Sequence, residues 1–434
     1  MWLLFSEKNT HRLSLFFGIV IVIGIFVSFA VRVLPSIGIA GLFLTGVGYS
    51  IRHRCIAQRA QWPALLSFVG IYLLHALTGI AHYSSAGGTL VQDLVLQLPF
   101  LLLPLAFLLL PTWPAAYRTT LWLVLIGCCV VSALSATINY VAHYDEINDS
   151  YFRSQVIPTP QDYIRLSLLI SMAVLVGAVL LFTKALPRFW RSLTAAAVLS
   201  LFVFQHLFAV RSGLLTMYVG GAILLVWLAT QRQHRKAALL VTVLLAGLAG
   251  ACLYFFPTLQ NRIVNTRYDA GLMDLTDAAN NHSITARIYS YKVAWAVVHE
   301  HPMLGVSKVK LNEEIASQYS YMYPQIGVEH YLMPHNQFLY NLAAYGVIGL
   351  IVFIISFYYP LWGALVKRNI LLVLLYAVVS LSFLVEYTLE TQIGILTGIF
   401  FILVASVPAI PVVPVSLGCP AASGPSEPVV LPHA

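Results

Sequence analysis

Long apolar runs recur along nearly the whole chain, and they constrain its fold more than any other feature. Each run covers roughly 17 to 25 residues, the length that an α-helix needs to cross a bilayer. The composition agrees, because 59% of the 434 residues are hydrophobic, only 9% are charged, and the mean hydropathy is +0.84. Soluble domains carry about a quarter charged residues. The sequence therefore predicts an all-α polytopic membrane protein and excludes cytosolic enzymes, coiled coils and nucleic-acid-binding proteins.

The apolar runs predict about twelve transmembrane helices. The second is short and rich in glycine, which favours a hairpin with the first helix over an independent anchor. The fourth contains Pro99 and Pro104, and proline inside a helix produces a kink. The expected limits are 13–34, 36–51, 62–82, 90–110, 117–142, 163–183, 190–209, 213–230, 237–256, 335–359, 369–386 and 392–413.

Four regions follow from this pattern. Residues 1–256 carry nine helices, residues 257–334 form one large loop that contains short helices, and residues 335–413 carry three more helices. Residues 414–434 are rich in Pro, Ser and Gly, which predicts a disordered tail.

Lysine and arginine are distributed unevenly between the two sides of this arrangement. Of the 24 basic residues, 14 fall in short loops on the same side as Lys8 and Arg12. Cytoplasmic loops are enriched in these residues. Both termini and the tail are therefore predicted in the cytoplasm, and the loop 257–334 on the opposite face. Topology thus accounts for much of the net charge of +8.

The loop 257–334 is long enough to indicate a function. Ile284 to Val298 predicts an amphipathic helix with Ile288, Tyr291, Trp295 and Val298 on its apolar stripe, and Asn312 to Ser320 predicts a second helix. Several tyrosines in this loop indicate either a sugar-binding rim or a membrane-interface belt. These are Tyr319, Tyr321, Tyr323 and Tyr331.

Arginines on the outer side run against the topological preference. Arg211 lies in a very short turn between the seventh and eighth helices, where it either contacts lipid phosphate or clamps a phosphorylated ligand. Arg287 opens the amphipathic segment. Other arginines border the same face, and together they would form a pyrophosphate site, although each alone is as readily explained by a salt bridge. These are Arg153, Arg165, Arg262 and Arg267.

His335 and Asn336 follow Pro334 and lead directly into an apolar helix. The positive end of the helix dipole favours a neutral imidazole, which can accept a proton, although a histidine that only caps or packs is the simpler explanation. Asn336 is a candidate for orienting the histidine, binding sugar or capping the helix.

His299, Glu300 and His301 offer metal-binding groups, but neighbours along a helix do not share a face. No Asp-x-Asp pair occurs in the sequence. We therefore expect no metal site and no cofactor.

Several of these elements resemble the O-antigen ligase and polymerase superfamily. His335-Asn336, nine residues, Gly346, two residues and Gly349 match the ligase pattern H-[NSQ]-x9-G-x-x-G. Arg211 to Leu215 matches R-x3-L, and the segment from His301 to Val306, HPMLGV, is similar to the family core. The resemblance covers residues 202–349 well, whereas the first half matches only as a membrane bundle.

The resemblance implies a GT-C-type fold in the inner membrane of a Gram-negative bacterium, with a periplasmic active site. It implies metal-independent, inverting transfer of O-antigen polysaccharide from undecaprenyl diphosphate to a sugar hydroxyl of lipid A-core, in lipopolysaccharide biosynthesis. His335, Arg211 and Arg287 are the implied catalytic set. Candidate substrate-binding residues are Asn336, Arg153, Arg165, Arg267 and His301.

Alternatives remain open. An O-antigen polymerase or a protein O-oligosaccharyltransferase would share the donor and differ in the acceptor. A lipid flippase would perform no chemistry, but a transporter should bury charges at mid-membrane. Here the charged residues lie toward the outer ends of the predicted helices, which favours a one-sided active site. These residues are Asp93, Arg165, Arg211, Glu386 and Glu390. A groove opened by Pro99 and Pro104 is the expected place for the polyprenyl chain, and the oligomeric state stays undetermined.

Overall fold

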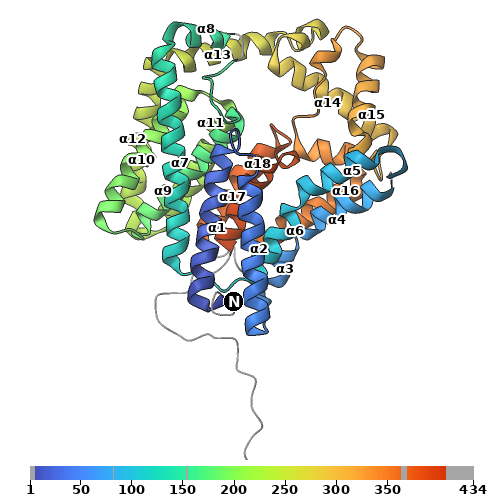
Figure 1. The fold of residues 1–434 in the computed structure, drawn as a ribbon. Coiled ribbons are helices and arrows are strands. Elements are labelled where there is room, and N and C mark those ends of the chain that lie inside the picture. The colour runs from blue at the N-terminus through green and yellow to red at the C-terminus, as the bar shows by residue number, and fades with distance from the viewer. Residues whose placement is uncertain (1–4, 82, 153–154, 363–368, 407–434) are drawn as a thin grey trace, which may run out of the picture.

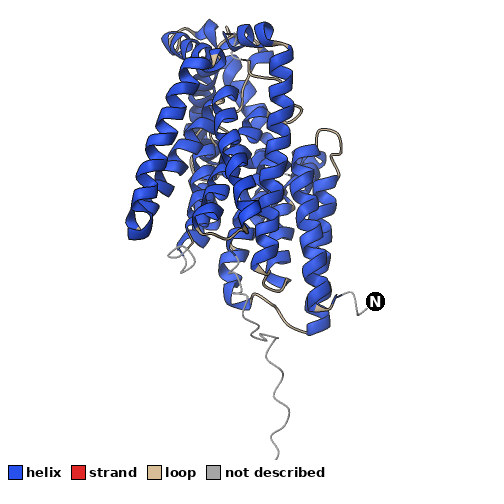
Figure 2. Cartoon of the chain, turned by 90° about the vertical axis from the view of Figure 1, so that its left-hand side faces the viewer, coloured by secondary structure: helices blue, strands red, loops and turns tan. Residues whose placement is uncertain are grey.

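The fold is known from a computed structural model that describes residues 5–81, 83–152, 155–362 and 369–406. These residues form helices and loops with no strand among them (Figure 2). Nine helices within the described ranges are long and apolar enough to cross a membrane, and ten if one bent pair counts as a single span. The predicted all-α polytopic fold is therefore confirmed.

The spanning helices coincide with the predicted apolar runs, and they stand side by side in one bundle (Figure 1). Eight of the nine contain one α-helix each, one of them preceded by the 3-10 turn Arg232–His234, and the ninth, Leu90–Leu109, is built from two. The eight are α1 (Glu7–Val27), α2 (Leu34–His53), α7 (Ala115–Ala142), α9 (Tyr163–Phe182), α10 (Arg188–Phe208), α11 (Arg211–Thr230), α12 (Arg235–Phe255) and α16 (Gln337–Trp362).

Two predicted helices are interrupted. The fourth divides at Leu98 into α5 (Tyr83–Gln97) and α6 (Pro99–Leu109), where Pro99 takes the first helical position and lacks an N–H group. The third divides into α3 (Trp62–Leu66) and α4 (Val69–Ala81), with a bend of 44° that the sequence did not predict.

Two other predictions need correction. The second helix, α2, is 20 residues long and apolar, so it is long enough to be a span in its own right as well as the hairpin partner of α1. The eleventh predicted span is shorter than expected, and the twelfth is described only as far as Ser406. They correspond to α17 (Ile370–Phe383) and to the segment Gln392–Ser406, in which α18 (Gln392–Ile395) and α19 (Phe401–Ser406) flank one π-helical turn. Residues 407–413 lie outside the described part.

Residues 257–334, which we call the cap, lie at the end of the bundle opposite the N-terminus (Figure 1). They contain α13 (Pro257–Gly271), α14 (Ser283–Glu300) and α15 (Lys308–Met322), beside the short α8 (Tyr144–Phe152). The sequence indicated α14 and α15 but missed α13.

The predicted apolar stripe of α14 was wrong in its register. The helix buries the face formed by Ala286, Tyr289, Val293 and Val297, whereas Trp295 is 52% exposed. Small residues on the buried face allow α14 to pack closely against α15 and α16. Only Val298 of the predicted stripe is buried.

A backbone junction joins the cap to α16. The segment Pro302–Ser307 forms four main-chain hydrogen bonds with Ala343–Ile348, including Ser307 N–H to the Ala344 carbonyl at 2.8 Å and Val347 N–H to the Pro302 carbonyl at 2.9 Å. Gly305 and Gly346 adopt φ values of 63° and 65°. A Cβ atom at either glycine would overlap the backbone of the opposite segment. The glycine of the motif is therefore required by this close approach, and α16 is broken there.

A buried ionic cluster holds α15 against the bundle. Lys308 on α15 forms salt bridges with Asp93 on α5 and with Glu390, the latter at 2.6 Å. His75 on α4 contacts the same Asp93 carboxylate at 3.1 Å and the Tyr345 hydroxyl at 2.9 Å. Although burial alone would lower the pKa of Lys308, the two carboxylates outweigh burial and raise it above its usual value. Asp93 and Glu390, which were predicted among the charges of a one-sided active site, therefore anchor the cap.

Candidate active site

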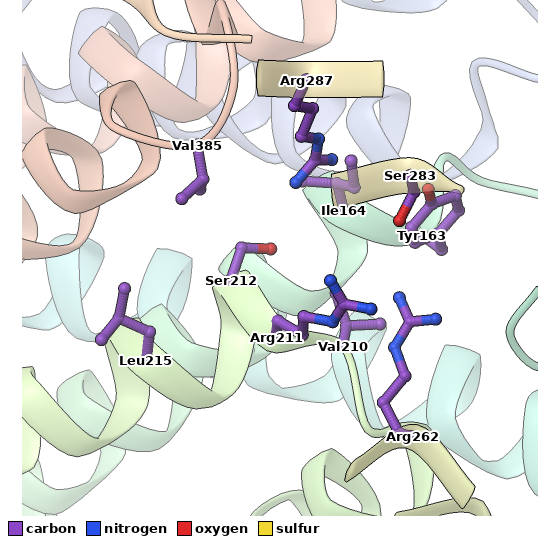
Figure 3. A pocket seen from close by; sticks show the side chains of 10 residues that line it. All are labelled: Tyr163, Ile164, Val210, Arg211, Ser212, Leu215, Arg262, Ser283, Arg287 and Val385. Carbon is purple, nitrogen blue, oxygen red and sulfur yellow. The ribbon is translucent and has the colours of Figure 1, made fainter. Parts of the chain in front are cut away.

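Three arginines from three helices line one cavity on the cap side of the bundle. Arg211 begins α11, Arg262 lies on α13, and Arg287 lies on α14, so the cavity forms where the cap meets the spans (Figure 3). Its volume is about 160 Å³. The other lining residues are Tyr163, Ile164, Val210, Ser212, Leu215, Ser283 and Val385.

Arg211 is placed by a tight turn, as the sequence predicted. The chain leaves α10 through Ala209, which has a φ of 48°, and enters α11 two residues later. At the end of α10, the Phe208 carbonyl accepts a hydrogen bond from Tyr151 Oη at 2.9 Å, and the Leu207 carbonyl accepts one from Thr258 Oγ1 at 2.7 Å. This turn is therefore fixed by α8 and α13 rather than by solvent.

An acid close to these arginines, Asp269, already forms hydrogen bonds with the protein. Asp269 is fully buried, and its carboxylate accepts hydrogen bonds from Ile284 N–H at 2.9 Å and from Thr285 N–H at 3.3 Å. It therefore caps the first turn of α14, the helix that carries Arg287. Across the described ranges, none of the three cavity arginines forms a salt bridge with an acid. The rim salt bridges expected for Arg262 and Arg287 are thus not found there.

Arg262 is the most deeply buried of the three. Only 8% of the residue is exposed, and within the described structure its Nε and Nη1 atoms have no hydrogen-bond partner. Burial lowers the pKa of Arg262, but arginine titrates so high that it stays charged. Arg211 is better satisfied, because Nη2 donates to Asn265 Oδ1 at 3.3 Å. The cavity thus presents positive charge and unused donors, which is the chemistry of an anion site.

His335 lies next to this cavity but is not among the residues that line it. Its Nδ1 atom is 3.2 Å from Oε2 of Glu386, and the side chain is 17% exposed. Val385, the neighbour of Glu386, lines the arginine cavity. Tyr291, one turn beyond Arg287 on α14, donates its hydroxyl to the His335 carbonyl at 2.8 Å. The predicted histidine and arginines are therefore adjacent and connected through α14.

Glu386 follows α17 and was not predicted as the partner of the histidine. Burial alone would raise the pKa of Glu386, but the hydrogen bond from His335 and the charges of Arg165 and Arg287 outweigh burial and lower it. Glu386 is therefore ionised and can orient the imidazole by accepting a hydrogen bond from Nδ1 of His335. A lone acid at the end of an apolar run was the signal for it, because buried charge is costly.

Asn336 caps α16. Its Oδ1 accepts hydrogen bonds from the N–H groups of Phe338 and Leu339, both at 3.0 Å. Of the three roles considered for this residue, capping is the one that the structure shows, and it orients the first turn of α16 directly after His335.

Three of the remaining substrate-binding candidates do not line the cavity. Arg267 is exposed on α13, and His301 is exposed after α14. Arg165 forms a salt bridge with Asp162 at 3.0 Å, and its charge acts on Glu386. Arg153 lies outside the described residues. Arg262, which the sequence predicted as one of several arginines of a pyrophosphate site on this face, lines the cavity, whereas Arg165 and Arg267 do not.

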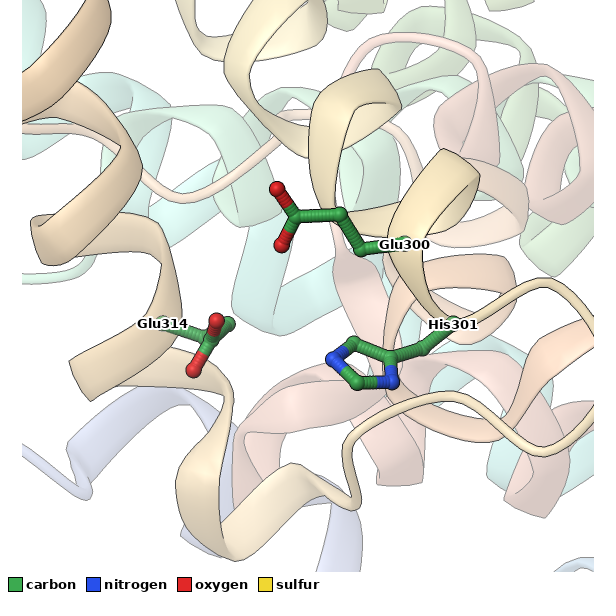
Figure 4. A group of neighbouring side chains, drawn as sticks. All are labelled: Glu300, His301 and Glu314. Carbon is green, nitrogen blue, oxygen red and sulfur yellow. The ribbon is translucent and has the colours of Figure 1, made fainter.

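A possible metal-binding group lies elsewhere on the cap. Glu300, His301 and Glu314 direct their side chains toward one another, with the ligand atoms within 4.8 Å (Figure 4). The group includes neither His299, which contacts the Trp295 carbonyl at 2.9 Å, nor any residue of the arginine cavity. Gln318 already donates to Glu300 at 2.8 Å. Exposed acidic groups of this kind are common without an ion.

Comparison with known proteins found one family model that is similar to part of the chain. This model, described as O-Antigen ligase, matches residues 195–354. The matched segment contains the turn before α11, the whole cap, and Gly346 and Gly349 of α16. It ends before Glu386. No curated protein is significantly similar to the chain.

Proposed function

We propose that this chain, whose residues 195–354 match the O-antigen ligase family model, transfers O-antigen polysaccharide from undecaprenyl diphosphate to lipid A-core. The acceptor atom is a sugar hydroxyl, and the reaction takes place at the periplasmic face of the inner membrane. The family supports a glycosyltransferase-like ligase or polymerase. The donor, the acceptor and the mechanism are our proposal.

The convergence of Arg211, Arg262 and Arg287 on one cavity carries the proposal. A diphosphate is dianionic or more and offers several acceptor oxygens, which match guanidinium donors that form no salt bridge among the described residues. In a glycosyl diphosphate, negative charge grows on the leaving oxygen as the glycosidic bond breaks. Preorganised cations placed at that point stabilise the transition state more than the ground state.

His335, held by Glu386, supplies the general base that the reaction also needs. With Nδ1–H donated to Glu386, Nε2 is the atom left to accept a proton. The acceptor hydroxyl attacks the anomeric carbon from the side opposite the diphosphate, and its proton passes to Nε2. The bond between the anomeric carbon and the diphosphate oxygen breaks, and undecaprenyl diphosphate leaves with the electron pair. The product is inverted at that carbon.

The position of the cap supports the periplasmic assignment. The cap and the arginine cavity lie at the end of the bundle opposite the N-terminus, where Lys8 and Arg12 begin the series of basic short loops. By the charge rule for membrane proteins, that basic end faces the cytoplasm. The cavity is then on the side where lipid-linked glycan meets its acceptor.

The test is an acceptor assay with purified protein and an undecaprenyl-diphosphate-linked glycan. The acceptor is lipid A-core, a second lipid-linked glycan, or a pilin-like protein, each in a separate reaction. The proposal requires glycosylated lipid A-core, and it requires Arg211→Ala to abolish the product while Arg32→Ala, an exposed arginine outside the cavity, does not. Product formed only with the glycan or the protein acceptor would reassign the enzyme to polymerase or protein transferase.

Two further arms complete the test. Chelation should leave activity unchanged, because the arginines provide the charge stabilisation, whereas loss of activity would revive the group at Glu300, His301 and Glu314. Movement of the lipid-linked glycan across proteoliposomes without any glycosylated product would indicate a flippase and contradict the proposal.

A further inference from the structure

A second cavity lies within the membrane-spanning part of the bundle. It forms a groove of about 470 Å³ between α1 and α7, which are neighbours in the bundle (Figure 1). This volume is within the range of about 300–1,000 Å³ found for small-molecule sites. Apolar side chains dominate its lining, among them Ile23, Phe26, Val27, Val124 and Val131.

The groove opens toward the surface of the bundle. Phe29 is 54% exposed and Val131 is 67% exposed, and both line it. Gly127 forms part of its floor, and a Cβ atom added there would meet no other atom within 4 Å. Because α1 and α7 both qualify as membrane spans, this opening faces lipid. An occupant must therefore be an apolar chain that reaches the groove from within the bilayer.

One short segment borders both cavities. Pro160 and Gln161 line the groove, whereas Tyr163 and Ile164 line the arginine cavity. Gln161 Nε2 donates to the Phe26 carbonyl at 2.9 Å and to Ser132 Oγ at 3.3 Å, which holds the segment across the end of α1 and against α7. The apolar groove therefore ends within a few residues of the anion site, and one amphiphilic molecule with an anionic head can occupy both.

We propose that the groove between α1 and α7 binds the isoprenoid tail of the donor while its diphosphate lies among Arg211, Arg262 and Arg287. This assignment rests on the proposed function and adds the place of the lipid tail. A single polyprenyl chain suits one groove that ends at a diphosphate site. A phospholipid, in contrast, has two acyl chains and a single phosphate.

The assignment replaces the groove expected at the proline-containing helix. Pro99 and Pro104 of α6 are both buried, as are Phe100 and Leu103 beside them. This part of α6 packs into the core instead of opening to lipid. The kink therefore does not provide the tail site.

The test uses Gly127→Phe, which adds a bulky side chain to the lining of the groove at a position where a Cβ atom meets no other atom within 4 Å. Gly247→Phe is the matched control, because Gly247 is also an exposed glycine on a spanning helix, α12, with no atom within 4 Å of an added Cβ. Binding of undecaprenyl diphosphate, farnesyl diphosphate and inorganic diphosphate to the full-length protein in detergent is measured by isothermal titration and native mass spectrometry.

We expect the unmodified protein to bind undecaprenyl diphosphate more tightly than farnesyl diphosphate. Gly127→Phe should weaken binding of the long-chain ligand by at least about ten-fold, equivalent to about 1.4 kcal/mol, and leave inorganic diphosphate unaffected. Gly247→Phe should match the unmodified protein. An unchanged preference for the long chain in Gly127→Phe, an equal loss in Gly247→Phe, or a phospholipid that undecaprenyl diphosphate does not displace overturns the assignment.

Failure of the proposed function would look different. If inorganic diphosphate does not bind, or binds without needing Arg211 and Arg262, the anion site is wrong even where Gly127→Phe still weakens binding of the long chain. If diphosphate binding depends on both arginines and chain length has no effect, only the groove is wrong.

Discussion

Nδ1 of His335 lies 3.2 Å from Oε2 of Glu386, although the two residues are 51 positions apart in the sequence. His335 precedes α16 and Glu386 follows α17, so the pair depends on the packing of two membrane helices. The contact leaves Nε2 of the imidazole as the remaining nitrogen for a substrate proton. It gives the histidine a carboxylate that fixes its tautomer and stabilises its protonated form.

The first prediction concerns this pair. His335→Ala should lower the turnover rate about 10²- to 10⁴-fold, the usual contribution of a general base. Glu386→Gln keeps the size of the side chain but removes its charge, so we expect a loss of at least about ten-fold. Single-turnover transfer to lipid A-core measures both.

The double variant separates a positioning role of Glu386 from an independent one. If Glu386 acts through His335, Glu386→Gln should have little further effect in the His335→Ala background. Multiplicative losses in the double variant would show that Glu386 contributes without the histidine.

The second prediction compares two arginines of the same helix. Arg262 is buried in the cavity, whereas Arg267 is exposed on α13. Arg262→Ala should reduce transfer at least about 100-fold, the range seen when one transition-state donor is removed, with partial recovery in Arg262→Lys. Arg267→Ala should have a small effect. Initial rates at saturating acceptor provide the comparison. A larger loss in Arg267→Ala than in Arg262→Ala would favour Arg267, the substrate-binding residue predicted from the sequence.

The third prediction concerns stability. Lys308→Met leaves the carboxylates of Asp93 and Glu390 buried without their cation, and loss of one partner from a buried ion pair costs about 3–5 kcal/mol. Thermal unfolding in detergent should therefore occur at a clearly lower temperature. Adding Glu390→Gln should recover part of the loss, because it removes one of the two unpaired charges. Lys310→Met on the same helix, which has no salt bridge within the described residues, serves as the control. Equal melting temperatures for the two lysine variants would show that the cluster does not stabilise the cap.

The fourth prediction concerns the motif glycine of α16. Gly346→Ala imposes a side chain on a φ of 65° and overlaps the backbone of Met303. The backbone strain alone costs about 1–3 kcal/mol, and the overlap adds to it. We expect a lower melting temperature and faster proteolysis between α14 and α15. Gly221→Ala in α11, where an added Cβ has open space, should be neutral or stabilising. A Gly346→Ala protein as stable as the control would contradict the structural role.

Hydropathy predicted most of the bundle, because membrane spans must be long and apolar whatever they pack against. The bend between α3 and α4 and the short α17 could not be predicted in this way. Both depend on packing against neighbouring helices, and hydropathy does not show which face of a helix packs against which neighbour. The register of α14 was wrong for the same reason: its buried face is chosen by α15 and α16, and small residues such as Ala286 serve there as well as large ones.

The candidate site was predictable where a local pattern carried it. His335 and Arg211 lie at helix starts that the sequence marks, with a proline before one and a very short turn before the other. Arg262 and Arg267 could not be ranked, because both are arginines of an unpredicted helix and only its orientation buries one of them. Glu386 is paired with His335 by the tertiary packing of α16 and α17, for which no local sequence signal exists.

The junction at Gly305 and Gly346 has a consequence for how substrates are accommodated. It follows α14, which carries Arg287 and Tyr291, and it fastens that part of the cap to α16, the helix that begins after His335. In the proposed mechanism, these main-chain hydrogen bonds fix the distance between His335, the proton acceptor, and Arg287, which binds the leaving diphosphate, before any glycan binds. Arg262 lies outside this junction, on α13, so adjustment to saccharides of different bulk is left to the residues between α13 and α14.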